Sequence, residues 1–271
     1  MSLVEEIMTS DPVTVSVDTY ATTVRSILRN NGFRCVPVVS NKRLEGIITR
    51  GDILNISSNK SNVDARGLME KPKIIATPEM DVNEIAKKLV TADEVQAPVV
   101  ASSEDMTLLG IISVVDILNW LLEKSYKPNK KIAEEIYTSS VVTCNNDDSI
   151  SYVWNKMDDT GFSGLPVIKN KKMIGIITRK DIINSGHVRI VKESDEIKRS
   201  IKVEKIMKTP PIVATSEMKI EEIAKLLVKC DIGRLPVVEN PVFIKKMANS
   251  ARESDLIGII SREDVLESYL N

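Results

Sequence analysis

The chain has 271 residues, enough for about two domains, and 42% of them are hydrophobic, as in an ordinary soluble core. Its 37 basic and 38 acidic residues give a net charge of -1, which argues against a nucleic-acid-binding surface over the whole molecule but not against a local one. No apolar run could cross a membrane, the N-terminus lacks the pattern of a signal peptide, and Cys35, Cys144 and Cys230 form no CxxC pair, so we expect a cytoplasmic protein with reduced thiols.

A seven-residue phrase recurs four times along the chain. It consists of a glycine, two isoleucines, a threonine or serine, two variable residues and an aspartate. A hydroxyl and, three residues later, a carboxylate therefore follow an apolar, strand-like run. The copies begin at Gly46, Gly110, Gly175 and Gly258.

Two further landmarks recur with this phrase. An apolar-Pro-Val element precedes each copy, with its proline at Pro37, Pro98, Pro166 and Pro236. Exactly 29 residues before each proline stands a large side chain, which is Met8, Met69, Tyr137 or Met207. Four equal spacings predict four structural repeats with a period of 61 to 70 residues, read from proline to proline.

Each repeat predicts the same order of elements. A short apolar run such as Val13–Val17 predicts a strand, and a helical pattern follows, as in 82–90, which Asp81 with Glu84 is expected to cap. Two short strands come next, and their internal proline implies a strand start or a sheet edge. A second helix opens at the Thr or Ser. Because a β-α-β-β-α unit of about 60 residues is marginally stable alone, we expect the units to pack in pairs.

Three segments fall outside the repeat pattern. The charged run 123–131 would join the second repeat to the third, and the charged run 187–202 is expected to be a helical connector. In the fourth repeat, 22 residues separate Pro236 from Gly258, against 9 in the first and third repeats. We therefore expect a mobile loop or a short helix between Asn240 and Asp255.

Motifs of catalysis are missing from the sequence. It has no Gly-rich P-loop, no GxSxG and no HExxH, and the single histidine, His187, lies in a charged connector. No nucleophile and base can be paired. We expect neither an enzyme nor a metal site.

The Thr/Ser-x-x-Asp ending of the phrase has two interpretations. It fits a capping box, in which both side chains satisfy backbone N–H groups at a helix start. It also fits a nucleotide site, because a helix N-terminus and a hydroxyl can bind phosphate, and a carboxylate can accept hydrogen bonds from two ribose hydroxyls. The residues alone leave both interpretations open.

The four repeats resemble CBS domains (cystathionine β-synthase domains) arranged as two Bateman modules, and the resemblance covers nearly the whole chain. It implies an α+β fold of four mixed α/β units that form a flat disc. Because the chain carries no other domain, it is similar to γ subunits of AMP-activated protein kinase. The implied boundaries are 1–60 and 61–124 for the first module, 125–131 for the linker, and 132–195 and 196–271 for the second module.

The resemblance also implies which residues bind a ligand. The ribose would lie on Asp52, Asp116, Asp181 and Asp264, and the ribose or phosphate near Thr49, Ser113, Thr178 and Ser261. Arg50, Arg179 and Arg262 directly follow three of the hydroxyls, while Arg34 and Arg234, just before the Pro-Val element, are the strongest phosphate candidates. The second repeat has Val114 at the arginine position and offers a phosphate least.

The base would contact the end of the first strand and the start of the following helix. These positions are Ser16, Ala21, Thr77, Val82, Asn145, Ile150, Thr215 and Ile220, with Ile47 and Ile176 of the Gly-Ile-Ile runs. The apolar members also fit a plain hydrophobic core. The resemblance implies that partner units share each site, so that Asp181 pairs with Thr215 and Arg234, and Asp52 with Thr77.

The resulting hypothesis is a regulatory sensor, not an enzyme, that binds AMP, ADP or ATP between paired units and acts on a protein partner. S-adenosylmethionine or a related adenosyl ligand is an alternative that needs no phosphate-binding arginine. A nucleic-acid-binding or scaffold role for the 240–255 segment, with Lys245, Lys246 and Arg252, is a third hypothesis that the balanced charge disfavours. We expect no membrane partner, and either a monomeric disc or a homodimer.

Overall fold

The structure, a computed structural model, describes residues 2–54, 63–185 and 201–270. Most of the expected connector 187–202 lies outside the described residues. The described helices are α1 (Ala21–Asn30), α2 (Arg50–Leu54), α3 (Val82–Thr91), α4 (Val114–Glu123), α5 (Ile150–Thr160), α6 (Arg179–Asn184), α7 (Ile220–Lys229) and α8 (Arg262–Glu267). The described strands are β1 (Thr9–Ser10), β2 (Val15–Ser16), β3 (Cys35–Ser40), β4 (Arg43–Thr49), β5 (Gln96–Val100), β6 (Leu108–Ser113), β7 (Cys144–Asn145), β8 (Gly164–Lys169), β9 (Lys172–Thr178), β10 (Arg234–Glu239) and β11 (Asp255–Ser261).

The expected order of elements is confirmed in all four repeats. The apolar periodicity at 82–90 and 220–228 becomes α3 and α7, whose apolar faces are buried. In the first and third units the opening strand runs parallel to the Pro-Val strand. In the second and fourth units it shrinks to one bridging residue, Ala76 or Ala214. Proline fits in these strands because Pro98 and Pro236 accept hydrogen bonds from that bridging residue, at 2.9 Å each, and need to donate none.

Two units form a module because the segment that precedes the opening strand of each unit, here called its entry segment, pairs with the partner unit. Thr9 pairs with Ile111 of the second unit, and Ile47 of the first pairs with Glu70 of the second. The second module repeats this arrangement with the pairs Thr138–Ile259 and Ile176–Lys208. The large side chain 29 residues before each proline therefore packs on the phrase glycine of the partner unit. The pairs are Met8 on Gly110, Met69 on Gly46, Tyr137 on Gly258 and Met207 on Gly175.

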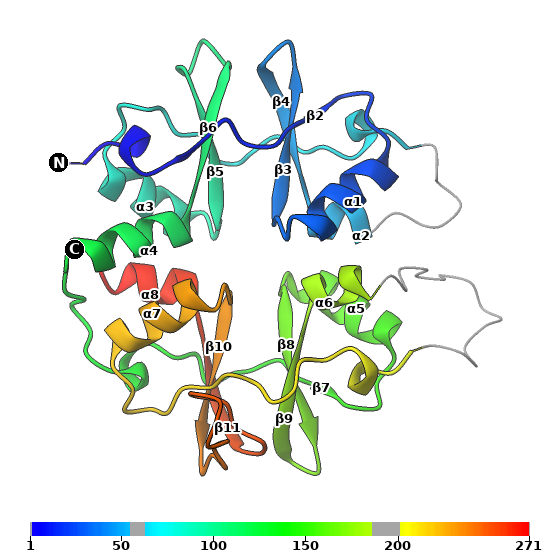
Figure 1. Cartoon of the computed structure of the whole chain (residues 1–271), viewed down its shortest axis with the longest axis vertical. Helices are drawn as coiled ribbons and strands as arrows, with labels where there is room; N and C mark the ends of the chain where they lie inside the picture. Colours follow the sequence, from blue (N-terminus) through cyan, green and yellow to red (C-terminus); the bar gives the residue numbers. More distant parts are fainter. Residues whose placement is uncertain (1, 55–62, 186–200, 271) are drawn as a thin grey trace.

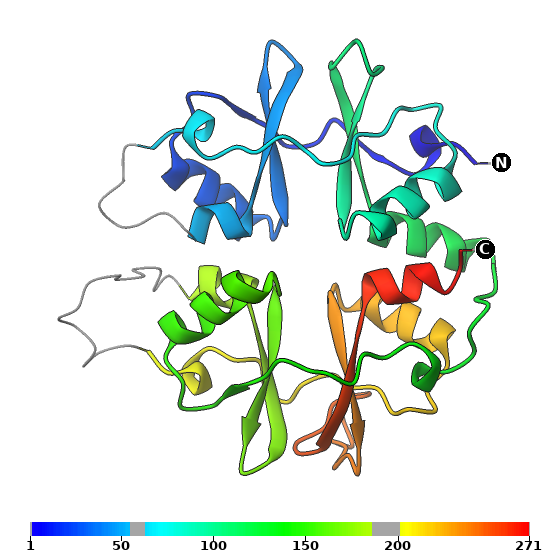
Figure 2. The same ribbon diagram turned by 180° about the vertical axis from the view of Figure 1, so that it is seen from behind.

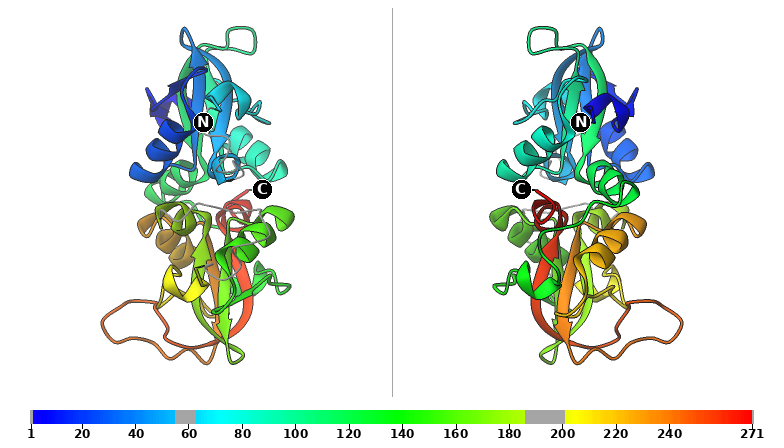
Figure 3. Two further views of the ribbon diagram at one scale, coloured as in Figure 1. Left: turned by 90° about the vertical axis from the view of Figure 1, so that its right-hand side faces the viewer. Right: turned by 90° about the vertical axis from the view of Figure 1, so that its left-hand side faces the viewer.

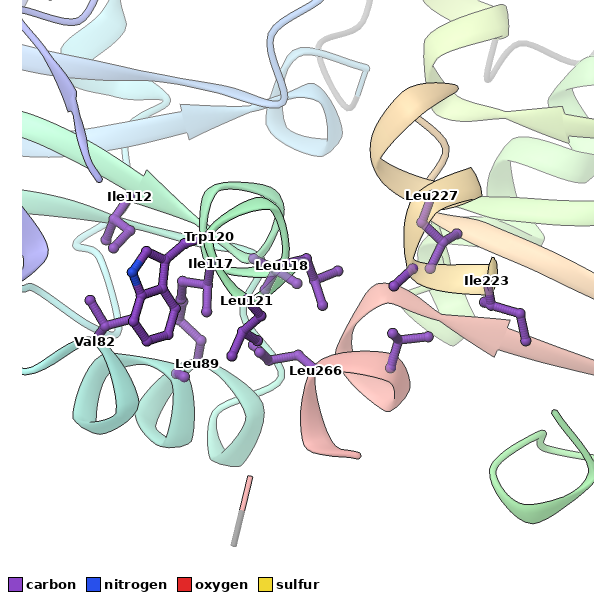
Figure 4. Packing of buried hydrophobic residues seen from close by; sticks show 14 of the residues in the cluster. Val82, Leu89, Ile112, Ile117, Leu118, Trp120, Leu121, Ile223, Leu227 and Leu266 are labelled. Atoms are coloured by element: carbon purple, nitrogen blue, oxygen red, sulfur yellow. The ribbon is translucent and has the colours of Figure 1, made fainter. Parts of the chain in front are cut away.

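The two modules face each other through their helices and form a plate with one unit near each corner (Figures 1 and 2). Seen edge-on, the plate is narrow (Figure 3). The second and fourth units share one hydrophobic cluster, in which Leu118 and Leu121 of α4 approach Leu266 of α8 and Leu227 of α7 (Figure 4). Each fully buried leucine of this kind contributes roughly 1.5–3 kcal/mol of burial free energy.

The first and third units meet through smaller helices. The second helices of these units, α2 and α6, contact each other. Leu54 of α2 belongs to the cluster that holds Trp154 and Ile182 of the third unit. No helix of the described residues combines the length and the apolar character that a membrane crossing requires.

The structure corrects one local expectation and decides between the alternatives of another, since the segment after Glu239 is a loop and not a short helix. Asp81 does cap α3, accepting from Asn83 at 2.8 Å, but Glu84 bonds Lys88 at 2.7 Å instead of completing a capping box. The 240–254 segment contains no helix. It is an extended loop whose backbone pairs with the segment Pro211–Val213, because Asn249 accepts from Val213 and Ala251 donates to Pro211.

The packing of Tyr137 on Gly258 predicts a specific cost of overpacking. A Cβ at position 258 would collide with the Tyr137 ring, so Gly258→Ala should lower the free energy of unfolding by about 1–3 kcal/mol. In a Tyr137→Ala background the same change should cost much less, since the atoms nearest to that Cβ all belong to the Tyr137 ring. Urea unfolding of the four proteins measures this coupling. An equal cost in both backgrounds would contradict the exchange of entry segments.

Candidate functional site

Each Thr/Ser-x-x-Asp motif lies at the start of the second helix of its unit. The backbone N–H of the first residue donates to Oδ2 of the aspartate, and the aspartate N–H donates back to the hydroxyl oxygen at 3.1 to 3.4 Å. The N–H to Oδ2 distances are 2.7 Å in Thr49–Asp52, 2.8 Å in Ser113–Asp116, 2.9 Å in Thr178–Asp181 and 2.7 Å in Ser261–Asp264. All four motifs therefore work as capping boxes.

The cap occupies only one of the two carboxylate oxygens. Within the described part of the chain, Oδ1 of Asp52, Asp116 and Asp264 carries no hydrogen bond. The capping and ligand interpretations are thus compatible, because Oδ2 holds the helix while Oδ1 is left to accept from a ligand hydroxyl. Burial raises the pKa of Asp116, against the opposing hydrogen bonds from Ser113.

The hydroxyls are less available than the carboxylates. The hydroxyls of Thr49, Ser113 and Thr178 donate to the same Oδ2 that caps the helix. To donate to a phosphate, each would have to rotate away from its carboxylate. A phosphate role for these hydroxyls stays a prediction.

The remaining capping aspartate, that of the third unit, is different. Asp181 is 7% exposed, and Nζ of Lys208 lies 3.7 Å from its Oδ1. Lys208 belongs to the entry segment of the fourth unit, which pairs with Ile176. A largely exposed lysine thus forms a long ion pair with the oxygen that is left open in the other three motifs.

The candidate base contacts divide by burial. The apolar members Ala21, Val82, Ile150 and Ile220 are buried at the starts of their helices, which favours the core interpretation. Ser16 and Asn145 are exposed, and Thr77 and Thr215 are half-buried. Ile47 and Ile176 are half-buried and alternate with buried neighbours along β4 and β9, so they lie on the outer faces of those strands.

The pairing of each site across two units stays a prediction that the topology favours. The segment carrying Lys208 runs beside Ile176 and leads on to Thr215, and the segment carrying Glu70 runs beside Ile47 and leads on to Thr77. Arg234 of the fourth unit reaches the third unit, where it donates to Ser163 at 2.8 Å and lies 5.1 Å from the Phe162 ring.

The arginines that follow the hydroxyls are directed into their own units, where sequence reasoning had placed them toward phosphate. Arg50 donates to the carbonyl of Gly32, and Arg179 to that of Met157 at 3.0 Å. Arg262 is 1% exposed and donates to the carbonyls of Ile232 at 2.8 Å and Leu227 at 3.3 Å. These contacts stabilise the end of the first helix in the first, third and fourth units.

A cluster of charges gathers where the two modules meet. The carboxylate of Asp231 lies 2.9 Å from Arg262, 3.3 Å from Lys180 and 3.9 Å from Arg34. Arg34 comes from the first unit, Lys180 from the third, and Arg262 and Asp231 from the fourth. Burial first, and the charge of Arg262 second, lower the pKa of Arg34 to about 10, against an opposing effect of Asp231. Three cations therefore surround one carboxylate, and the charges of Arg50 and Glu263 also act on Arg34.

Sequence reasoning missed three charged residues, two in this cluster and one beside Asp181. Lys180 fills the variable position next to Arg179, and Asp231 and Lys208 lie outside the repeated landmarks. The one signal was positional, since Asp231 follows α7 as Asp93 follows α3, and both adopt positive φ, at 48° and 54°. The described residues contain no group of three or more His, Cys, Asp or Glu side chains that could hold a metal ion.

The charge cluster predicts a pH-dependent contribution of Asp231. Burial alone would raise its pKa, but the hydrogen bond and charge of Arg262, with Arg34 and Lys180, lower it below its ordinary value of about 3.9. Asp231→Asn should therefore lower the free energy of unfolding at pH 7 by up to about 1 kcal/mol. The difference should vanish as the pH falls through the lowered pKa, where the native carboxyl also becomes neutral. Urea unfolding at several pH values measures it.

Asp93→Asn is the matched control for this prediction. Asp93 occupies the corresponding left-handed position in the second unit, where asparagine is also tolerated. It should change stability little at any pH. Equal losses in the two variants would show that the charge cluster does not stabilise the contact between modules.

The different burial of the three cysteines predicts that an alkylating reagent reacts with only one of them. Burial raises the pKa of both Cys35 and Cys144 to about 12, whereas Cys230 is exposed. Because the thiolate is the nucleophile, iodoacetamide at pH 7.5 should alkylate Cys230 alone in the folded protein and all three cysteines in urea. Peptide mass spectrometry reads the sites. Equally fast labelling of Cys35 would contradict its burial in β3.

Comparisons with known proteins agree with this architecture. The CBS domain model matches residues 4–59, 65–123, 133–187 and 203–271. The chain is 27% identical over 282 residues to the uncharacterized protein MJ1225 of Methanocaldococcus jannaschii, covering 92% of each protein. It also aligns with the crystal structure of MJ1225, described as a proposed archaeal homologue of γ-AMPK, at a TM-score of 0.82 and 26% identity, over 98% of this chain and 99% of that one.

A second solved structure supports the fold alone. It is an uncharacterized conserved protein from Pyrococcus horikoshii, with a TM-score of 0.65 and 24% identity, over 99% of this chain and all of the other. The expected four units, paired in two modules, are thereby confirmed. With four matched segments that together span most of its length, the chain belongs to the CBS-domain family.

Proposed function

We propose that the protein is a regulatory sensor, without catalytic activity of its own, that binds adenine nucleotides between paired CBS units. The observation that carries the proposal is the carboxylate oxygen Oδ1 that three capping boxes leave open, in Asp52, Asp116 and Asp264. A carboxylate held rigidly by its other oxygen is well suited to accept hydrogen bonds from ribose hydroxyls. Half-buried strand faces beside it offer apolar contact to a base.

The position of the helix starts supports a role for phosphate. Gly51, in the first turn of α2, lies against the Arg179 guanidinium of the opposite module, where a Cβ would come within 3.0 Å of Nη1. Helix starts from both modules therefore converge beside the cluster of Arg34, Lys180 and Arg262. A phosphate placed there would gain charge-assisted hydrogen bonds from more than one unit.

This arrangement suggests how binding is transmitted. A nucleotide phosphate would compete with Asp231 for cations that belong to different modules, and would thus favour one relative placement of the modules over another. The ligand shifts the balance between placements only by its difference in affinity for them. A protein partner that recognises one placement then reads the nucleotide concentration.

A panel of ligands tests the proposal. AMP, ADP, ATP, S-adenosylmethionine and GMP are compared by thermal shift and then by calorimetry. A ligand at a hundredfold its dissociation constant adds about 2.7 kcal/mol per site, which corresponds to about 5–10 °C in Tm for a domain of this size. We expect shifts with the adenine nucleotides and none with GMP.

Variants separate the phosphate contribution from the adenosine contribution. Arg34→Gln should weaken binding of AMP, ADP or ATP about tenfold, since it removes one charged hydrogen bond, and should leave S-adenosylmethionine unaffected. Lys245→Gln, on the exposed loop, is the control and should change neither. Absence of binding by every adenosine compound would refute the proposed function. A response to S-adenosylmethionine alone would select the adenosyl-ligand alternative.

A further inference from the structure

The third and fourth units have matching strand pairings, so each residue of one unit can be compared with its counterpart in the other. Cys144 pairs with Val167 in the third unit as Ala214 pairs with Val237 in the fourth. Counting from these pairs, Thr143 corresponds to Val213 and Val141 to Pro211. Likewise Ile168 corresponds to Val238, and Leu256 to Met173, through the matching register of the two hairpins.

On one side of the module the structure is hollow. An open pocket of about 330 Å³ is lined by Ser139, Val141, Thr143, Ile168 and Lys171 of the third unit and by Asp255 and Leu256 at the start of β11. Ser139, at one end of the lining segment, directly follows Thr138, which pairs with Ile259, two residues before the cap of Asp264. The lining combines apolar side chains with two hydroxyls and the charged groups of Lys171 and Asp255, and such a mixture can both contact a flat heterocyclic base and bond its polar edge.

On the other side, the protein fills the corresponding space itself. Ala251 of the inserted loop is fully buried in a cluster with Met173, Val213 and Val238, the counterparts of three residues at the hollow. The loop is anchored there because Val213 donates to Asn249 at 2.8 Å, Ala251 to Pro211 at 3.1 Å and Met173 to Ser254 at 2.9 Å. The loop stands out from one face of the plate at this point (Figure 3).

The carboxylates differ in the same sense. Asp264 has an open Oδ1, whereas Oδ1 of Asp181 already forms an ion pair with Lys208 at 3.7 Å. The residue at the position of Lys208 in the third unit is Thr138, which carries no charge. Both ends of a ligand site are therefore available on the Asp264 side and taken on the Asp181 side.

Resting on the proposed function, we infer that the second module binds its adenosyl ligand only on the Asp264 side, with the base in the hollow beside Val141, and that the inserted loop 240–254 acts as a built-in occupant of the Asp181 side. The second module thus has one ligand site where its sequence offers two motifs. The loop thus fills one of two similar clefts with protein and leaves the other open to the ligand.

Calorimetry with AMP on the full chain tests this inference by stoichiometry. Asp264→Asn should reduce the number of AMP molecules bound by one, while the matched variant Asp181→Asn should leave the number unchanged. Val141→Trp, which fills the hollow, should weaken the same site at least tenfold. Asparagine still accepts hydrogen bonds at a helix start, so both aspartate variants keep a cap.

Shortening the loop gives an independent test. The second unit has no insertion, and its segment Ser102–Met106 makes the equivalent contact, since Leu44 donates to Met106 at 2.8 Å. A chain with that segment in place of 240–254 should bind one additional AMP, which Asp181→Asn should then remove. If Asp181→Asn removes an AMP from the unmodified chain, or Asp264→Asn removes none, the inference is wrong although the proposed function stands. If the unmodified chain binds no AMP, the proposed function fails first.

Discussion

The hydrophobic contact between the second and fourth units determines how the two modules face each other. A single cluster runs through α3, α4, α7 and α8, and it contains Leu118 and Leu266 from opposite modules. Burial of apolar surface is the dominant favourable term in such contacts and has no directional preference. It fixes one half of the plate and thereby brings the helix starts of the other half together.

The junction of the modules also has a charged component beside its apolar contacts. There Arg34 of the first unit, Lys180 of the third and Arg262 of the fourth surround Asp231, and partly exposed charge pairs of this kind contribute little stability compared with apolar packing. Weak charge pairs next to strong apolar packing give a ligand anion a place where modest binding energy can alter the contact. This contrast is the physical basis of the proposed sensor.

The repeated landmarks predicted the fold because they encode contacts between units. The 29-residue spacing of Tyr137 and Pro166 recurs because one residue packs on the glycine of the partner phrase while the other lies in the unit's own strand. The periodicity at 82–90 similarly predicted α3, since its apolar face had to be buried. The spacing predicted a loop or a short helix at 240–254, but the course of the loop could not be predicted, because it depends on pairing with Pro211–Val213, far away in sequence.

The candidate site was predicted only in part, and its ligand contacts stay predictions. The Thr/Ser-x-x-Asp motifs placed four carboxylates at helix starts, but sequence could not reveal that Lys208 pairs with one of them. Nor could it reveal the direction of Arg262, which follows its hydroxyl in sequence yet turns inward to the end of α7. Side-chain direction depends on which carbonyls the tertiary fold leaves unsatisfied, and this information is not local.

The most direct test of the account is a crystal structure of the protein with AMP bound. The account predicts ribose hydroxyls within hydrogen-bonding distance of Oδ1 of a capping aspartate, with Oδ2 still bonded to the backbone N–H of its Thr or Ser. It also predicts the phosphate near the cations at the junction of the modules. Nucleotide bound elsewhere on the surface, or nucleotide in a cleft whose capping aspartate makes no ribose contact, would contradict it.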